Sequence, residues 1–474
     1  HELPSIEKPE IDPLSINPDK ESDFKKEVDA LGFQAFEPKF LVKGTDYQMK
    51  EISDGVTLIH AQNPLNDLFN LEVRFNMGNE HNSTLPYLKR MLDRAGAGDI
   101  SSEDLKIEWY KLATEFSFGV REFFSAFSIN GLDENFETSL ELSRKLLTAP
   151  NIAEEKWSET KKIILSERDD EQKNPNAISN ALAHYHRYGE QSRYRKRPSD
   201  EEINATSVQD LVNSLNELLD VDRSILYFGP RKFEEIESMI LSGFLGKKPA
   251  KEVNAIPPRR SAKPESNQIM FLQKEMAQAQ VRLEFSAGNY DELKLPQTQV
   301  FNEYFGGGMA GLVFQELREA RALAYSAWAH FFAPSRSVDE NILVGAIGCQ
   351  ADKTLEAVEA FIDLLDNMPI NDTRWDSAHS AILSSYRTNP IGSRARPGYA
   401  YDIDLLGLDS DPRKTRYQQI LASTSDSLKN FYESDIKPQN ILISIVGDSE
   451  KIDLEKLKEF GPVTEIKVEK LFRR

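Results

Sequence analysis

Histidines are the residues of this sequence that most often support hydrolytic metal chemistry, and there are seven of them. A hydrolytic zinc site needs two or three His, Asp or Glu ligands on rigid elements and an open position for water. None of the seven forms His-Glu-x-x-His or the inverse pattern His-x-x-Glu-His. His184 and His186 are two residues apart, a spacing that on a helix points two side chains away from each other. We therefore interpret this pair as surface polar residues rather than metal ligands.

A glycine-rich segment, Gly306-Gly-Gly-Met-Ala-Gly311, matches the pattern G-x-G-x-x-G of dinucleotide-binding turns. Such a turn follows a strand and opens a helix, whereas the apolar residues of 298–305 have helical spacing. A nucleotide site is therefore disfavoured. The segment is better interpreted as a flexible break between two helices, or as a loop that contacts an extended peptide.

Charge argues against nucleic acid as a partner. Asp plus Glu number 77 against 58 Lys plus Arg, for a net charge of −19. The basic run Arg193-Tyr-Arg-Lys-Arg197 imitates a nucleic-acid patch, but in so acidic a chain it is better explained as a solvated loop. We expect no nucleic-acid partner.

The single cysteine, Cys349, excludes an internal disulfide and a four-cysteine zinc site. It follows the apolar run 342–348 and is expected to be buried at a strand end, where its chemistry is inert. No Ser-His-Asp arrangement can be recognised, because such triads are defined by geometry rather than by spacing.

Composition is that of a globular protein, with 39% hydrophobic and 28% charged residues among 474. No apolar stretch approaches the ~18–20 residues that span a bilayer, so we expect no transmembrane segment. Domains usually have ~100–200 residues, so a chain of this length predicts two or three of them.

Three sequence features recur in the same order at a nearly constant offset, 210 residues for the first and 218 for the others, which indicates a duplicated unit. The pairs are Leu71–Asn79 with Val281–Asn289, Trp157–Ser166 with Trp375–Ser384, and Ile225–Gly229 with Ile443–Gly447.

Strand and helix periodicities alternate within each unit. Residues 71–75 and 281–285 alternate apolar and polar side chains, as half-buried strands do. Residues 103–114 and 353–365 place apolar side chains three and four apart, as amphipathic helices do. We predict an α+β fold of two tandem homologous domains, each a mostly antiparallel sheet packed against helices on one face.

Prolines and charge set the predicted boundaries. Residues 1–44 are charged and carry prolines at positions 4, 9, 13 and 18, which predicts an arm or linker, with a docked N-terminal strand as the alternative. Prolines at the centre of the chain predict an inter-domain linker over 257–268. The first α+β domain is then 45–256 and the second is 269–474.

The segment from Phe301 to Tyr325 closely resembles the second domain of the insulinase/pitrilysin-like zinc metallopeptidases, and the likeness extends over most of the chain beyond residue 45. The resemblance implies the tandem α+β units already predicted. It also implies a zinc motif His-x-x-Glu-His with a third, glutamate ligand some seventy-five residues later.

This sequence departs from that zinc motif. Tyr87 and Met91 stand where the two histidines belong, Arg90 replaces the catalytic glutamate, and only Glu167 matches, as the third ligand. One carboxylate cannot hold zinc firmly, and an arginine cannot act as a general base at neutral pH. We expect no metal on this chain and no peptide hydrolysis by the chain alone.

Members of the resembled family work as two similar halves that close on a peptide, and the half without zinc contributes an Arg and a Tyr seven residues apart. Arg318 and Tyr325 match this pair, and Gly306, Gly307 and Gly308 match a substrate-contacting loop. A guanidinium and a phenol are donors suited to a developing oxyanion. The alternative is that Arg318 pairs with a nearby glutamate and Tyr325 packs on a strand.

The sequence therefore predicts the non-catalytic half of such a peptidase, with zinc in a partner half or subunit and an unfolded peptide as substrate. The alternative is a structural or peptide-binding scaffold that has left proteolysis. The proline-containing arm resembles the linker of the family's long single-chain members, so a separate subunit and a C-terminal half both stay open. A periplasmic or cell-envelope location is expected from the family's long forms and the missing initial Met.

Overall fold

A computed structural model describes residues 22–32, 36–321, 323–437 and 439–474. The chain divides into two units, His1–Pro38 and Lys39–Arg474. The described part of the first unit contains one helix, α1 (Asp23–Ala30), whose N-terminus is capped by the Ser22 hydroxyl accepting from the Lys25 N–H. Most of the predicted arm over 1–44 lies outside the described residues.

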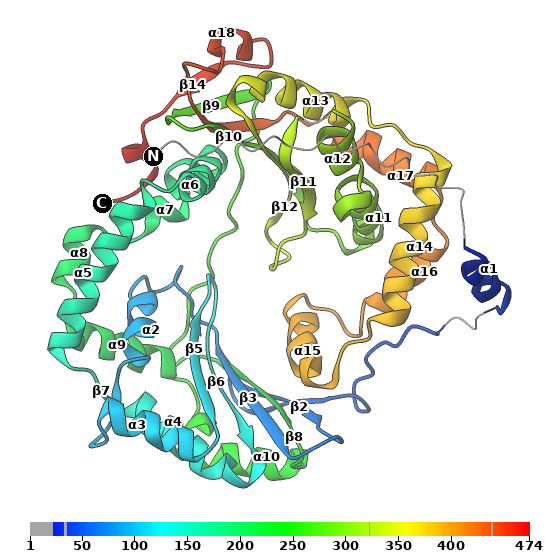
Figure 1. Ribbon diagram of the computed structural model, residues 1–474. Coiled ribbons are helices and arrows are strands. Elements are labelled where there is room, and N and C mark those ends of the chain that lie inside the picture. The colour runs from blue at the N-terminus through cyan, green and yellow to red at the C-terminus, as the bar shows by residue number, and fades with distance from the viewer. Residues whose placement is uncertain (1–21, 33–35, 322, 438) are drawn as a thin grey trace, which may run out of the picture. The chain divides into compact units, whose positions relative to one another are not determined.

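Two six-stranded sheets organise the second unit, one in each half of its sequence (Figure 1). The order in the first sheet is β1-β2-β8-β3-β6-β5, and in the second β11-β12-β10-β13-β9-β14. The first comprises β1 (Gln48–Ser53), β2 (Val56–Gln62), β3 (Leu68–Phe75), β5 (Glu115–Val120), β6 (Ser125–Leu132) and β8 (Arg223–Gly229). The second comprises β9 (Gln268–Gln273), β10 (Gln278–Asn289), β11 (Ala324–Phe332), β12 (Glu340–Gln350), β13 (Leu442–Gly447) and β14 (Val463–Glu465).

Five strands of each sheet follow the same plan. In the first sheet β2 pairs in parallel with β8, and β8, β3, β6 and β5 continue antiparallel. In the second sheet β9 pairs in parallel with β13, and β13, β10, β12 and β11 continue antiparallel. The sixth strands differ, because β1 forms an antiparallel hairpin with β2 whereas β14 runs parallel to β9. Two sheets of mostly antiparallel strands confirm the predicted fold class.

Most helices of each half cover one face of its own sheet and close a large apolar core there. The helices of the first half are α2 (Leu85–Leu92), α3 (Ser102–Lys111), α4 (Phe136–Thr148), α5 (Glu154–Glu171), α6 (Pro175–Tyr188), α7 (Arg193–Lys196), α8 (Asp200–Ala205), α9 (Val208–Leu219) and α10 (Phe233–Ser242), with the short strands β4 (Gly96–Ala97) and β7 (Pro150–Asn151). The helices of the second half are α11 (Leu295–Phe301), α12 (Leu312–Phe314), α13 (Thr354–Asp366), α14 (Asp372–Thr388), α15 (Arg396–Leu405), α16 (Arg413–Leu421), α17 (Ser425–Phe431), α18 (Leu454–Leu457) and α19 (Val468–Leu471), with the π-helical segments η5 (Asn302–Gly306) and η7 (Gln315–Ala320).

The opposite face of each sheet receives a helix from the other half, which the sequence analysis did not anticipate. Helix α6 packs against β10 and β13, and Leu182 and Tyr185 share a buried cluster there with Val446. Helix α15 packs against β2 and β8, where Tyr401 meets Ile59. In Figure 1 both helices lie on the sides of the sheets away from the main helical layers. This exchange ties the two halves into one compact unit.

His184 and His186, interpreted from the sequence as surface residues, are buried on α6. Helix α6 is covered on several sides, so residues two apart both lose their solvent. His184 Nδ1 lies 3.1 Å from the Ser192 hydroxyl, and His186 Nδ1 lies 3.0 Å from the hydroxyl of Ser444 on β13. Burial lowers the pKa of His186 to about 4. Burial, with nearby arginines, lowers the pKa of His184 to about 2.

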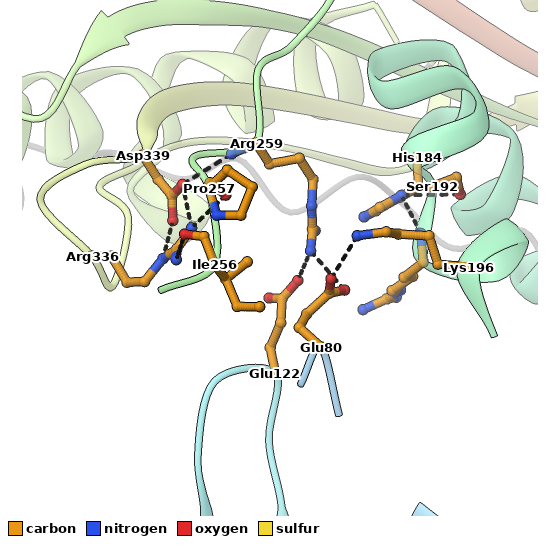
Figure 2. A network of polar contacts seen from close by, with 11 residues as sticks. Glu80, Glu122, His184, Ser192, Lys196, Ile256, Pro257, Arg259, Arg336 and Asp339 are labelled. Atoms are coloured by element: carbon orange, nitrogen blue, oxygen red, sulfur yellow. Dashed lines mark hydrogen bonds and ion pairs between the residues drawn. The ribbon is translucent and has the colours of Figure 1, made fainter. Parts of the chain in front are cut away.

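The segment between the two sheets is anchored to both halves by charge (Figure 2). The Arg259 guanidinium donates to Glu122 and, over 3.0 Å, to Glu80, a carboxylate that also accepts from Lys196 over 2.8 Å. On the other side the Arg259 N–H donates to Asp339 over 3.2 Å. Arg336 binds Asp339 and donates to the Ile256 carbonyl over 2.8 Å. The boundaries predicted at 44/45, 256/257 and 268/269 stay predictions.

Candidate functional site

The positions that match the zinc motif lie on α2 and α5. Helix α2 forms because Leu85, Leu88 and Met91 line one apolar face against the first sheet, with Pro86 in its first turn, where a missing N–H costs nothing. Met91 is fully buried in the core of the first half. Tyr87 is buried as well, whereas the Arg90 side chain keeps 41% of its surface exposed.

The structure brings Arg90 and Glu167 into direct contact. The two guanidinium Nη atoms donate to the two carboxylate oxygens of Glu167 over 3.2 and 2.5 Å. This two-point pairing is the geometry that arginine and carboxylate favour. The carboxylate that matches a zinc ligand is therefore neutralised by the side chain that replaces the catalytic glutamate.

Tyr87 is held by a different arginine. Arg168, buried on α5, donates to the Tyr87 hydroxyl over 3.1 Å and to Asp200 over 2.8 Å. Burial raises the pKa of the Tyr87 phenol, and the positive charge of Arg168 opposes that rise. The phenol thus stays a neutral hydrogen-bond acceptor for Arg168.

These side chains do not fit zinc. A buried neutral phenol, a thioether and a guanidinium stand at three of the four positions, and the remaining carboxylate is engaged by Arg90. Thioethers suit soft ions such as Cu(I), and a guanidinium repels any cation. Across the described residues, no group of three or more His, Cys, Asp and Glu side chains is placed to hold a metal ion.

Arg318 lies in the π-helical segment η7 and keeps 46% of its side chain exposed. Its Nε atom is 3.7 Å from a Glu319 oxygen, and its guanidinium lies 4.8 Å from the centre of the Phe314 ring. The contact with Glu319 is long and exposed, so it contributes little stability. The guanidinium is oriented by the ring and keeps donors free for a ligand.

Tyr325 lies near the start of β11, and 76% of its surface is exposed. The β11–β12 register skips at this point, because Ala324 pairs with Cys349 and Ser326 pairs with Gly348. Tyr325 is therefore the extra residue of a β-bulge, a device that turns a side chain out of the regular alternation. No contact between Tyr325 and Arg318 is seen. Both donors are therefore exposed, but they do not form a pair.

At each of the three positions matched to a substrate-contacting loop, glycine suits the backbone for a different structural reason. At Gly306, a Cβ atom would lie 1.9 Å from the Ala329 carbonyl oxygen, so only glycine allows η5 to approach β11 this closely. Gly307 has no room for a Cβ beside the Glu303 carbonyl. Gly308 has a φ of +61°, a conformation that glycine adopts freely, and a Cβ there would meet nothing.

An exposed aromatic row on β11 was missed by the sequence analysis. Trp328 and Phe332 point to the same open face, while Ala327, Ala329 and Phe331 are buried on the other. Arg282 on β10 lies 5.4 Å from the centre of the Trp328 ring. The alternation within Ala324–Phe332 was the available signal, since a strand with one open face shows this pattern.

A cavity of about 1,070 Å³ lies apart from Arg318 and Tyr325. It is bounded by residues 121–124, 253–258 and 334–338 and by the C-terminal part of α15. Arg336, whose guanidinium stacks 3.9 Å from the centre of the Phe123 ring, forms part of its wall. No residue that the sequence analysis singled out for the site lines it.

Two other sequence features have structural explanations. Within the basic run, Arg195, Lys196 and Arg197 are paired with Glu190, Glu80 and Glu171 respectively. Cys349 is buried at the next-to-last position of β12, as predicted, and burial raises the pKa of its thiol to about 11. A thiol with so high a pKa is a poor nucleophile.

Residues 225–378 match the family model of the peptidase M16 inactive domain. No curated protein matches the chain significantly. The matched residues run from β8 to α14 and include the glycine-rich segment, Arg318 and Tyr325. In the part of the chain that the structure describes, no helix is both long and apolar enough to cross a membrane.

Solved structures share the fold at low sequence identity. The peptidase M16 inactive domain from Pseudomonas fluorescens superposes with a TM-score of 0.71 and 16% identity, covering 85% of this chain and 98% of that one. A protease from Helicobacter pylori gives 0.68 and 13%, covering 86% and 100%.

The periplasmic protease PqqL from Escherichia coli gives a TM-score of 0.69 at 15% identity. The match covers 92% of this chain and 48% of PqqL, so the chain spans about half the length of that protease. The predicted resemblance is thereby confirmed: residues 225–378 match the inactive-domain model of the M16 peptidases, and the fold is shared with solved M16 structures.

Proposed function

We propose that this chain is the non-catalytic half of a zinc metallopeptidase, which closes a chamber over an unfolded peptide while a zinc-bearing half hydrolyses it. The observation that carries the proposal is the match to the inactive domain together with the Arg90–Glu167 pair, which occupies the zinc-motif positions with a closed ion pair. Zinc and the general base then come from the partner half, and the chain alone is inactive.

Arg318 and Tyr325 are the donors that this half presents to the substrate. Both side chains are exposed, and the tyrosine is set outward by a β-bulge. A guanidinium and a phenol stabilise negative charge that develops on a carbonyl oxygen during hydrolysis. In this proposal the two groups meet on the bound peptide; without it, the Arg318 guanidinium lies over the Phe314 ring.

The first experiment identifies the partner. The tagged chain is used as bait in the source organism, and the eluate is assayed with a quenched fluorogenic peptide. We expect a partner with His-x-x-Glu-His, hydrolysis that a zinc chelator abolishes, and no hydrolysis by the chain alone. Hydrolysis by the purified chain alone, or a partner without a zinc motif, would contradict the proposal.

Tyr325→Phe tests the second donor within the active assembly. Loss of one oxyanion donor typically lowers kcat by about 10²–10³-fold. Tyr110→Phe is the matched control, because Tyr110 is 86% exposed on α3, away from β11. If the two variants have the same rate as the wild type, the chain is better described as a peptide-binding scaffold, the alternative that the sequence left open.

We place the assembly in the periplasm. The support is the fold shared with PqqL, which is a periplasmic protease. Fractionation of the source cells with an antibody to this chain tests the assignment, and recovery with the cytosol would overturn it.

A further inference from the structure

The cavity of about 1,070 Å³ lies where segments of both halves meet. Its walls are the turn between β5 and β6 (121–124), the segment 253–258 between the two sheets, the loop between β11 and β12 (334–338) and the end of α15. Cavities of ~300–1,000 Å³ with a mostly apolar lining and a few polar groups are the usual sites of small molecules. This cavity has the size and the lining of such a site.

Apolar side chains on its walls are only partly covered by protein. Leu405 and Val338 keep 49% and 50% of their surface exposed. Phe123 and Ile256 are half-buried. Partly exposed apolar side chains that converge on one cavity gain free energy when a ligand removes them from water. The cavity therefore favours a ligand with a sizeable apolar part.

Two charged groups in the lining are neutralised by the protein itself (Figure 2). Arg336 donates to both carboxylate oxygens of Asp339, each over 2.8 Å. Glu122 accepts from the Arg259 guanidinium. Neither Arg336 nor Glu122 is therefore left to attract a charged ligand.

The two aspartates of the lining face other parts of the protein. An Asp402 oxygen lies 3.5 Å from an Nη atom of Arg74. An Asp222 oxygen lies against Gly55, in the turn between β1 and β2, where a Cβ atom on the glycine would approach it to 2.4 Å. The negative charges of the lining are therefore directed away from a common ligand.

Arg121 is the cation of this lining that has no protein partner. Within the part of the chain that the structure describes, its guanidinium makes no hydrogen bond, ion pair or ring contact. Its backbone is fixed, because the Arg121 N–H donates to the Phe124 carbonyl over 2.8 Å and its carbonyl accepts from the Asn79 N–H over 2.9 Å. A guanidinium on a fixed turn can bind a carboxylate at two points.

His81 supplies a second donor to the same cavity. Its Nδ1 accepts from the Gly78 N–H over 3.0 Å, so the ring proton is on Nε2. Burial lowers the pKa of His81, which keeps the ring neutral at pH 7. The backbone of 79–80 donates to the carbonyls of 121–122, so His81 follows directly on the segment that is paired with Arg121. One guanidinium and one neutral N–H suit a ligand with a single negative charge.

We propose that this cavity binds a small amphipathic carboxylate, a molecule with one carboxyl group on an apolar chain or ring system. The carboxylate accepts from the Arg121 guanidinium and from His81 Nε2, and the apolar part lies against Ile256 and Leu405. None of the groups proposed to meet the peptide lines this cavity. The ligand site is therefore separate from the proposed peptidase function and is tested without a partner half.

Methyl NMR of the purified full chain, with isoleucine, leucine and valine methyl groups labelled, tests the proposal with dodecanoate as the probe. Dodecanoate should shift the signals of Ile256, Val338 and Leu405 until they saturate. The signal of Leu471, which is buried on α19 and does not line the cavity, should stay unchanged. Dodecanol and dodecylammonium have the same chain but no carboxylate, so each should bind about tenfold more weakly or worse.

Arg121→Gln should weaken dodecanoate about tenfold or more and change the affinity for dodecanol by less than about twofold. Arg394→Gln is the matched control, because Arg394 is also exposed, has no hydrogen bond or ion pair among the described residues, and lies outside this cavity. Ala255→Trp should abolish binding of all three probes, since the indole fills the cavity from an exposed position on its wall.

Four results would overturn the proposal. Dodecanoate could fail to shift Ile256 and Leu405, or Arg121→Gln could bind it as tightly as the wild type. Dodecanol or dodecylammonium could bind as tightly as dodecanoate, and tight binding of the ammonium would assign the polar end of the cavity to Asp222. Shifts spread over both halves that persist in Ala255→Trp would show adsorption to the surface instead of a site.

Discussion

Arg90 and Glu167 in the first half bind each other at two points, whereas Arg318 and Tyr325 in the second half keep exposed side chains without a strong protein partner. The two halves share five strands in the same order, so the difference does not come from the fold. The difference comes from a few side chains, which are carried by sheets of the same strand order. In the first half Arg90 and Glu167 satisfy each other, as residues of a structural surface do. In the second half Arg318 and Tyr325 remain available, as residues of a binding surface do.

The exchanged helices differ in a similar way. Helix α6 carries two buried histidines, one of which, His186, contacts the second sheet, whereas α15 carries no histidine. The α6 contact is therefore weakened by acid. Helix α15 carries Asp402, whose pKa burial raises, so protonation of that carboxyl does not disfavour the folded state. Each difference between the halves can be tested by a substitution on one side with its counterpart on the other as the control.

The largest expected change is a gain of metal binding in the first half. Tyr87→His, Arg90→Glu and Met91→His together restore the donor set that α2 lacks, with Glu167 already 3.2 Å from the Arg90 guanidinium. We expect about one zinc ion per chain, measured by elemental analysis after dialysis, where the wild type binds none. Adding Glu167→Gln to this variant should weaken the binding. A folded triple variant without zinc would show that α2 and α5 no longer hold the required geometry.

Acid should loosen the α6 contact. The folded pKa of His186 is about 4, below its unfolded value of 6.5, so the folded state resists protonation while the unfolded state accepts it. The stability contributed by the neutral histidine is full above pH 6.5 and is lost as pH falls toward 4. The loss is about 3 kcal/mol. Urea unfolding at pH 7 and pH 4.5 measures it.

His186→Gln should show a smaller drop in stability between these two pH values. Hydrogen exchange should report opening at α6 before α15, because only α6 carries the histidines. Equal exchange of the two helices at pH 4.5 would contradict the difference drawn between them.

Trp157 and Trp375 correspond to each other in the two halves, 218 residues apart, and their contributions to stability can be compared. Trp157 is fully buried and its indole N–H donates to the Thr206 carbonyl over 2.8 Å, whereas Trp375 stacks on His379 at 5.2 Å between ring centres. Trp157→Phe should therefore cost about 1 kcal/mol more than Trp375→Phe in the free energy of unfolding. Denaturant midpoints at equal slope measure both. Equal costs would mean that the Thr206 hydrogen bond adds no net stability.

The smallest expected effect is that of Arg90→Ala on stability. The Arg90 and Glu167 side chains are 41% and 53% exposed, and ion pairs at such positions contribute about 0.2–1 kcal/mol. Thermal unfolding in low and high salt measures the loss, which salt should reduce. A loss of several kcal/mol would show that this pair is a buried structural element and not a surface replacement for a metal site.

Much of the fold follows from local pattern. The alternation in 71–75 and 281–285 predicts β3 and β10, and the amphipathic spacing in 103–114 and 353–365 predicts α3 and α13. Each of these elements buries one face in the core of its own half, so the spacing of its apolar residues follows directly from which face is buried. The corresponding tryptophans Trp157 and Trp375 lie on α5 and α14, which come after corresponding strands of the two halves.

Contacts between segments that are far apart in the sequence could not be predicted, because they leave no pattern in the residues of either segment. Helix α6 is apolar on the face toward the second sheet, but nothing in residues 175–188 says which sheet it covers, and this is why its histidines were expected at the surface. Asn302 is one polar residue in a helical stretch, and its hydrogen bonds with the Phe331 backbone form only when folding brings the two segments together. Sequence spacing suggested Arg90 and Glu167 as neighbours only through the resemblance to a family, since their pairing depends on the packing of α2 on α5.

The central claim is that the second half, and not the first, supplies groups to the reaction. Its most direct test is kcat/KM of the assembled peptidase with Arg318→Ala or Arg90→Ala in this chain, with folding checked by circular dichroism. We predict a loss of about 10²–10³-fold for Arg318→Ala and a rate within about twofold of wild type for Arg90→Ala, whose ion pair is exposed. Equal rates for the two variants, or a loss confined to Arg90→Ala, would contradict the account.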